Sequence, residues 1–318
     1  MGFREGAPGS ASSPQPHRPP LHYGCPPYLW GSRTTKPTST APESDPLTLV
    51  PSLALPQATD TRLRPLLRSL VNLETLSLHG CKQATDKSMH EVAELTRLTS
   101  LDVGSTKIRD DGAVAISRLP NLTSLRMGCT YALSVRGYEA LGRMPALTYL
   151  DANVCFGTDA CLYALGDLVG LQYLDIGHWQ LTHMGLDALI NFPSLTYLNL
   201  SGNKTLTSAD GMKALAELTS LQSLNLNDCP MVTDQSLSML SSLQQLETLS
   251  LGAGAKTRAS QITKLDALHG LASLRVVHLM HCPRMTDQGL SALPKHVRVN
   301  HSYGCDRVKG SGLYDGLG

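Results

Sequence analysis

Two aspartates, Asp151 and Asp175, are 24 residues apart, and a tyrosine precedes each by two positions (Tyr149 and Tyr173). Two carboxylates within reach of each other could act as an acid and a base in catalysis. The same residues could instead form a binding surface, because tyrosine combines a large apolar face with a polar tip and carboxylates attract basic groups. The choice depends on the elements that carry these residues.

The same spacing extends to further side chains. Tyr197 precedes Asn199 in the next unit, and Arg126 takes the aspartate's place one unit earlier. Trp179 follows Asp175 by four residues, at a position where the other units carry smaller side chains. It either displaces the turn or lies across the edge of a sheet. The predicted protein-binding residues are Tyr149, Tyr173, Tyr197, Asp151, Asp175, Asn199, Arg126 and Trp179.

A second group could bind metal, because it combines His278, His281, His296 and His301 with Cys282 and Cys305. Its spacing matches no standard zinc site, and the chain has no C-x-x-C pair. The sequence contains no phosphate-binding G-x-x-x-x-G-K-[ST] motif. It also contains neither the H-E-x-x-H motif of metalloproteases nor the G-x-S-x-G motif of serine hydrolases. The sequence therefore predicts a protein that is not an enzyme and has no catalytic residue, no metal and no cofactor.

The elements that carry these residues can be predicted from a repeat of about 25 residues. Leucines open nine units, and the first, fourth and sixth positions of each unit are apolar, as in Leu171, Leu174 and Ile176. A period of two predicts a short, half-buried strand. The units begin at Leu73, Leu98, Leu122, Leu147, Leu171, Leu195, Leu221, Leu246 and Leu274. Stacked units would form one parallel sheet, with residues 73–282 in continuous register.

A helix is expected after each strand. Thr-Asp pairs such as Thr85-Asp86 and Thr233-Asp234 follow the turn, and apolar residues at helical spacing come next. Threonine and aspartate are good N-cap residues. Degenerate units flank the nine, at Val50–Leu55 and at Val297–Val299. The pattern predicts an α/β right-handed solenoid, or horseshoe, with a parallel concave sheet and convex helices.

Composition narrows the function further. The chain has 318 residues and a formal net charge of +1, so no global basic field favours nucleic acid. No apolar run is long enough for a transmembrane helix, and the first residues lack a secretory signal. Residues 1–46 contain ten of the 19 prolines, which predicts a disordered tail before a repeat domain at 47–318.

Four cysteines share the ninth position of their units: Cys81, Cys155, Cys229 and Cys282. This position should point into the solenoid, and whole units separate the four. They are therefore expected to be buried, unpaired thiols. Free thiols are typical of a reducing compartment, so a cytoplasmic or nuclear location is expected.

The pattern L-x-x-L-x-L-x-x-N/C is the signature of a leucine-rich repeat. The segments GCKQATDKSMHEVAEL, DCPMVTDQSLSMLSSL and HCPRMTDQGLSAL resemble the cysteine-containing subclass of these repeats. That subclass is typical of F-box/leucine-rich-repeat proteins, the substrate receptors of cullin-type ubiquitin ligases. The resemblance covers residues 47–317. No F-box is seen, because residues 1–46 are too rich in proline to form one.

The first hypothesis is therefore a protein-binding adaptor or substrate-recognition subunit, with a ubiquitin ligase as the implied complex. The alternative is a non-enzymatic scaffold or regulatory protein with no ubiquitin link. A third is an enzyme that uses Asp151 and Asp175. The expected partner is a protein or peptide on the concave face, with neither nucleic acid nor membrane.

Overall fold

The computed structural model describes residues 52–253, 260–302 and 305–308. The chain divides into two units, Met1–Ala41 and Pro42–Gly318, and every described residue belongs to the second. The predicted tail and its boundary at residue 47 lie outside the described residues, as does Val50. All the described helices and strands therefore belong to the repeat unit.

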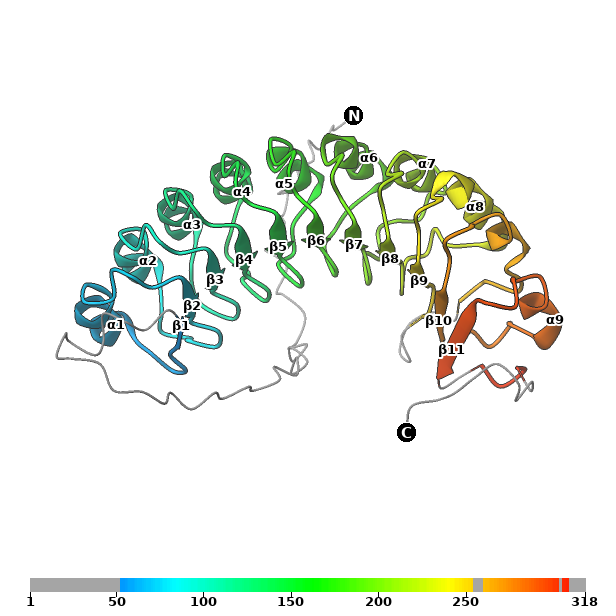
Figure 1. The fold of residues 1–318 in the computed structure, drawn as a ribbon, viewed down its shortest axis with the longest axis horizontal. Helices are drawn as coiled ribbons and strands as arrows, with labels where there is room; N and C mark the ends of the chain where they lie inside the picture. The colour runs from blue at the N-terminus through cyan, green and yellow to red at the C-terminus, as the bar shows by residue number, and fades with distance from the viewer. Residues whose placement is uncertain (1–51, 254–259, 303–304, 309–318) are drawn as a thin grey trace, which may run out of the picture. The chain divides into compact units, whose positions relative to one another are not determined.

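The strands form one parallel sheet in which each strand pairs with its neighbours in chain order (Figure 1). They are β1 (Ser52–Ala54), β2 (Thr75–Ser77), β3 (Ser100–Asp102), β4 (Ser124–Arg126), β5 (Tyr149–Asp151), β6 (Tyr173–Asp175), β7 (Tyr197–Asn199), β8 (Ser223–Asn225), β9 (Thr248–Ser250), β10 (Val276–Met280) and β11 (Arg298–Ser302). The predicted parallel sheet is confirmed, and the two degenerate units add β1 and β11 to its ends.

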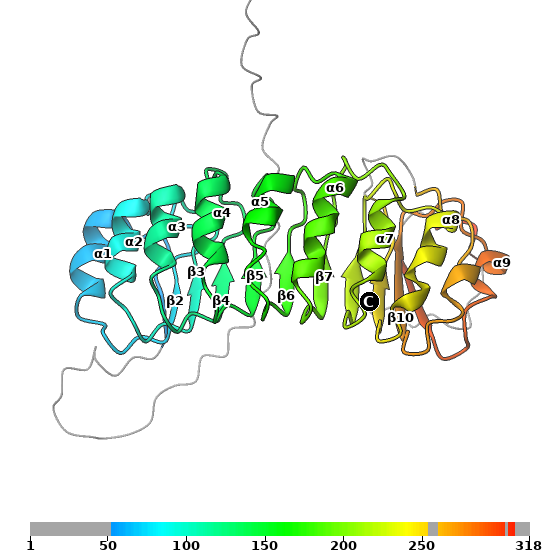
Figure 2. The ribbon, with the colours of Figure 1, turned by 90° about the horizontal axis from the view of Figure 1, so that it is seen from above.

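Helices cover the outer side of this sheet, and Figure 2, seen from that side, shows them as a separate layer in front of the strands. They are α1 (Asp60–Leu67), α2 (Asp86–Val92), α3 (Asp110–Ile116), α4 (Val135–Gly142), α5 (Asp159–Ala164), α6 (His183–Leu186), α7 (Gly211–Ala216), α8 (Asp234–Leu237) and α9 (Asp287–Leu290), with 3-10 helices η2 (Asp187–Asn191), η3 (Ser238–Ser242) and η4 (Asp266–Leu268). The predicted α/β solenoid with a concave sheet and convex helices is confirmed. Leucines from both layers fill the space between them.

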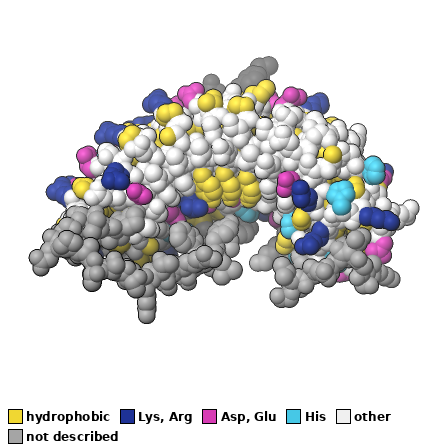
Figure 3. All heavy atoms as spheres, viewed as in Figure 1, with side chains coloured by type: hydrophobic (Ala, Val, Ile, Leu, Met, Phe, Trp, Pro, Cys, Tyr) yellow, Lys and Arg dark blue, Asp and Glu magenta, His cyan; other side chains and the backbone are white. Residues whose placement is uncertain are grey.

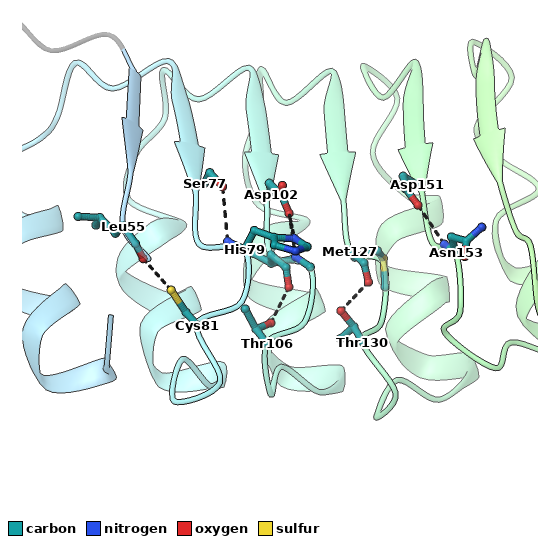
Figure 4. A network of polar contacts seen from close by, with 12 residues as sticks. Leu55, Ser77, His79, Cys81, Asp102, Thr106, Met127, Thr130, Asp151 and Asn153 are labelled. Carbon is teal, nitrogen blue, oxygen red and sulfur yellow. Dashed lines mark hydrogen bonds and ion pairs between the residues drawn. The ribbon is translucent and has the colours of Figure 1, made fainter. Parts of the chain in front are cut away.

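In most units the side chain at the ninth position donates a hydrogen bond to a backbone carbonyl. Cys81, Cys155, Cys229 and Cys282 are buried and free, as predicted. The thiols of Cys81 and Cys155 donate to Leu55 O at 2.8 Å and Met127 O at 3.1 Å, one unit back. Thr106 instead stays within its own unit and donates to Val103 O at 2.7 Å (Figure 4). Cysteine suits this position because its weak S–H satisfies a carbonyl that would otherwise be buried without a partner.

The Thr-Asp pairs have separate roles. Thr85 caps its own helix, since its side chain accepts from Lys87 N. The sequence predicts that the aspartate caps the same helix, but it points to the next unit. Asp159 accepts from the backbone N–H of Thr182 at 2.8 Å and from its hydroxyl at 2.6 Å. Asp234 holds Thr263 in the same way. The prediction that these aspartates are N-caps is wrong, and their carboxylates link consecutive units.

Candidate functional site

The centre of the concave face carries a column of three tyrosines. Strand register places Tyr149, Tyr173 and Tyr197 side by side on β5, β6 and β7. Their ring centroids are 4.0 Å apart at both steps, with interplanar angles of 11° and 4°. All three side chains are partly exposed. Figure 3 shows a compact block of hydrophobic-coloured side chains at the middle of the hollow side. We call these three residues the tyrosine column.

Arg126 extends the column at its β4 end. Its guanidinium carbon lies 4.7 Å from the centroid of the Tyr149 ring, which is a cation–π contact. In the sheet, Arg126 also pairs with Asp151. The surface therefore changes from cationic at β4 to aromatic at β5 to β7.

Hydrogen-bond donors of the protein itself occupy the carboxylate of Asp175. It accepts from Asn153 Nδ2 at 2.7 Å, from Asn199 Nδ2 at 3.0 Å and from Gly177 N at 3.0 Å. The Asp175 side chain is only 5% exposed and Asn199 is also buried. Burial raises the pKa of Asp175, and the three donors oppose that rise. The prediction that Asp175 and Asn199 are exposed contact residues is wrong, because each side chain takes its neighbour as its partner.

Asp151 lies beside this network and keeps partial exposure. It accepts from Asn153 N at 3.0 Å. Burial, together with the neighbouring Asp175, raises the pKa of Asp151 to about 6, although the hydrogen bond from Asn153 N and the charge of Arg126 oppose the shift. Near neutral pH this carboxyl can therefore either donate or accept a hydrogen bond. An acid–base pair with Asp175 is not supported, since both oxygens of Asp175 already accept from protein donors.

Trp179 belongs to the core, not to the concave surface. It is 2% exposed, and its ring meets that of Tyr138 edge-on at a centroid distance of 5.1 Å. Its Nε1 donates to Ala152 O at 2.8 Å, one unit back. A Cβ at residue 157 would lie 2.4 Å from the indole, so Gly157 is what makes room for it. The predicted exposure of Trp179 on the binding surface is wrong, because the indole is buried and replaces cysteine as the ninth-position donor.

A stacked aromatic pair at the edge of the sheet was not predicted from the sequence. Tyr131 and Phe156 follow β4 and β5, and their ring centroids are 5.3 Å apart. Both side chains are about half exposed. Phe156 has φ 55°, a left-handed conformation that is rare for a bulky residue. Both residues occupy the tenth position of consecutive units, and this shared position is the sequence signal from which the aromatic pair could have been predicted.

The histidine group does not come together as a metal site. Strand register pairs His278 with Asn300, and the Nδ1 of His278 lies 3.4 Å from Asn300 Nδ2. Within the described ranges, no three His, Cys, Asp or Glu side chains are arranged to hold a metal ion. Arg275, His296 and Arg298 instead line an open pocket of about 510 Å³ at the other edge of β10 and β11. In the part of the chain that the structure describes, no helix has the length and apolar character to cross a membrane.

Comparisons with known proteins agree with this architecture. The family model described as "Leucine Rich repeat" matches residues 95–117, 193–216, 217–241 and 270–293. Internalin C2 from Listeria monocytogenes is 23% identical over 67% of this chain and 83% of its own, with a TM-score of 0.53. Another internalin from that organism, internalin F, is 20% identical over 86% of this chain and 88% of its own, with a TM-score of 0.59.

A third solved structure is that of TLR13 in complex with ssRNA13. It is 19% identical over 80% of this chain and 36% of that chain, with a TM-score of 0.53. No curated protein matches the chain significantly in sequence. At these identities the similarities concern the fold alone. A function has to come from the residues of the concave face.

Proposed function

We propose that this chain, a leucine-rich-repeat protein, binds a protein or peptide on its concave face through the tyrosine column. The observation that carries the proposal is the stack of three partly exposed rings at the centre of that face. Tyrosine is enriched among residues that dominate interface energies, particularly near the middle of an interface. Leucine-rich-repeat proteins in general mediate protein–protein interactions.

The column is rigid before any partner arrives. Each ring is held by its neighbours at 4.0 Å, so little side-chain entropy remains to be lost on binding. Arg126 adds a cation at one end, and Asp151 adds a carboxyl beside Tyr149. This arrangement suits an extended peptide that lays apolar or aromatic side chains on the rings. A basic side chain would lie over Asp151.

The partner's charge should be visible in the pH dependence of affinity. A basic group over Asp151 favours the ionised carboxylate, whose pKa in the free protein is about 6. Binding of a basic peptide should therefore release protons and strengthen as the pH rises from 5 to 7. Asp151→Asn should remove this dependence.

Nucleic acid is the competing ligand, because one structure with a similar fold is an RNA complex. The strands β3, β5 and β6 place Asp102, Asp151 and Asp175 on the concave side, and only Arg126 in that row is a permanent cation. RNA phosphates on this row would lie over the partly exposed Asp151 and above the buried Asp102 and Asp175. Single-stranded RNA should consequently bind weakly, and the Tyr173→Ala substitution should not reduce its affinity.

The finer role that we propose is that of an adaptor or substrate-recognition subunit. The inward cysteines and the Thr-Asp pairs support a cysteine-containing repeat, and a ubiquitin-ligase complex is the setting that this resemblance implies. The alternative is a scaffold or regulator with no ubiquitin link. Mass spectrometry of copurified proteins separates them: a cullin and its adaptor among the partners support the first, and their absence supports the second. A cytoplasmic or nuclear location remains part of this proposal.

The decisive experiment compares partners captured by the full chain and two variants. Tyr173→Ala removes the middle of the column. Tyr163→Ala removes an exposed tyrosine on the convex helix α5 and serves as the matched control. Partners that bind the parent chain and the control but not Tyr173→Ala support the proposal. Partners that Tyr173→Ala retains in full would show that the column is not the binding surface.

A further inference from the structure

The last two turns of the solenoid bring two free thiols together. Cys282 follows β10 and Cys305 follows β11, which are adjacent strands (Figure 1). Both side chains are buried, Cys282 fully and Cys305 with 6% exposure. Their sulfurs approach consecutive carbonyls of one strand: Cys282 Sγ lies 3.6 Å from Met280 O, and Cys305 Sγ lies 3.8 Å from Leu279 O. The two thiols flank the same strand, and each shifts the pKa of the other.

The other inward cysteines offer a comparison within the same chain. Cys81, Cys155 and Cys229 occupy the corresponding position singly, with whole units between them. Each donates to a carbonyl of the preceding unit, at 2.8 to 3.1 Å. The equivalent contact of Cys282, to Leu251 O, is longer, at 3.8 Å. Its thiol is thus held less firmly to the preceding unit and lies against a second sulfur.

We propose that Cys282 and Cys305 are a reversible dithiol–disulfide pair, which a peroxide oxidises to join the last two turns of the solenoid. Neighbouring strands are about 4.8 Å apart, which lies within the ~4.4–6.8 Å between Cα atoms that a disulfide spans. A bond between residues just beyond the ends of these two strands therefore spans a distance of this order.

The reaction balances with hydrogen peroxide as the oxidant. The Cys305 thiolate attacks one peroxide oxygen, an S–O bond forms, the O–O bond breaks, and the departing hydroxide takes up a proton as water. The Cys282 sulfur then attacks the sulfenic sulfur of Cys305. An S–S bond forms, the S–O bond breaks, and the hydroxyl leaves as a second water with the Cys282 proton. The two thiols lose two electrons in total, and an external dithiol reverses the reaction.

Cys305 is the nucleophile of the pair. The neighbouring Cys282 thiol lowers the pKa of Cys305, although burial opposes the shift. The same contact raises the pKa of Cys282, so one thiol is ionised while the other keeps its proton. Asp306 and Arg307, which follow Cys305, are exposed, and a small oxidant can approach from that side. By contrast, burial raises the pKa of Cys229 to about 12, which leaves that thiol protonated and unreactive.

The test treats the full chain with graded hydrogen peroxide, blocks the remaining thiols and maps crosslinked peptides by mass spectrometry. The matched variants are Cys282→Ser and Cys305→Ser, with Cys229→Ser as the control at the same position of another unit. A Cys282–Cys305 crosslink should form in the parent chain and in the control, and dithiothreitol should reverse it. Oxidation should raise the Tm of these two proteins by several degrees and leave the two pair variants unchanged.

A second measurement does not depend on how well the variants fold. In the reduced parent chain at pH 7, iodoacetamide should label Cys305 at least ten times faster than Cys229. Labelling of Cys229 at the same rate, or peroxide treatment that yields no Cys282–Cys305 crosslink, would overturn the proposal.

Discussion

Asn153 donates its side-chain amide to Asp175 at 2.7 Å, and Asn199 reaches the same carboxylate from the opposite side. One buried acid thus connects three consecutive units beneath the exposed rings. The network explains why this part of the concave face can carry a carboxylate with almost no access to water, since every oxygen has protein donors.

Asp175→Ala should destabilise the domain by about 2–4 kcal/mol, because two buried amides lose their acceptor at once. Urea unfolding followed by circular dichroism measures the loss. Asp175→Asn keeps the shape and should cost less, since an amide oxygen still accepts one donor. An alanine variant as stable as the parent chain would mean that water replaces the carboxylate at no cost.

Asp151→Asn should stabilise the protein at pH 8 but not at pH 4. Burial raises the pKa of Asp151 to about 6 from 3.8, so the folded chain holds this proton more tightly than the unfolded chain. The stability from the protonated form is complete below pH 4 and is lost as the pH rises through 6. The gain at pH 8 should reach up to about 3 kcal/mol. Urea unfolding at both pH values measures it, and an equal effect at pH 4 and 8 would contradict the assignment.

Tyr173→Ala should weaken partner binding by about 2 kcal/mol or more, because this ring is the middle of the column. It should also lower stability by about 1–3 kcal/mol, since two stacked contacts are lost. Calorimetric titration with an identified partner, at a temperature where both proteins are folded, separates the two effects. Tyr173→Phe keeps the stack and should retain the stability. If Tyr173→Ala binds normally per folded molecule, the column is only structural.

Trp179→Phe should cost about 1–3 kcal/mol of stability, because Ala152 O loses its buried donor. Trp179→Ala should cost about 3–5 kcal/mol, since it also leaves a large cavity. Thermal unfolding reports both changes. Affinity for a concave-face partner should not change in the phenylalanine variant. A loss of affinity in the phenylalanine variant without a matching loss of stability would show that Trp179 contributes to the binding surface.

Asp159→Ala should cost about 1–2 kcal/mol, because the N–H and hydroxyl of Thr182 lose their acceptor in the preceding unit. Hydrogen exchange should show the loss first at α6, not at α5, which contains the aspartate. Asp187→Ala, in the 3-10 helix of the same region, is the control and should have little effect. Faster exchange in α5 alone would mean that Asp159 caps its own helix.

The spacing of the leucines is enough to predict the strands, their register and the inward cysteines. Each of these features follows from a residue pattern that recurs in every unit. The wrong predictions concern side chains whose contacts are made with residues of a neighbouring unit. The sequence places Asp175 on the concave face, but only Asn153 and Asn199 in the adjacent units reveal that the carboxylate is occupied. Both amides are visible in the sequence, yet the pattern of a single unit treats them as independent surface residues.

The burial of Trp179 could not be predicted for a related reason. Side-chain volume suggests that an indole does not fit the ninth position. Its fit depends on Gly157, which contributes no side chain, and on the donor chemistry that tryptophan shares with cysteine and asparagine. Cys305 lies beyond the nine units that leucines open, so no leucine period predicts its pairing with Cys282.

Two kinds of side-chain link between units, the carboxylates of the Thr-Asp pairs and the inward thiols, run in the same direction along the chain. The carboxylate of Asp159 lies in the earlier unit and accepts from donors of the later unit. The thiols of Cys155 and Cys229 lie in the later unit and donate to carbonyls of the unit before. During synthesis on the ribosome the earlier unit emerges first. Each new unit then meets acceptors that are already in place, so the solenoid can grow by addition from its N-terminal side, one turn at a time.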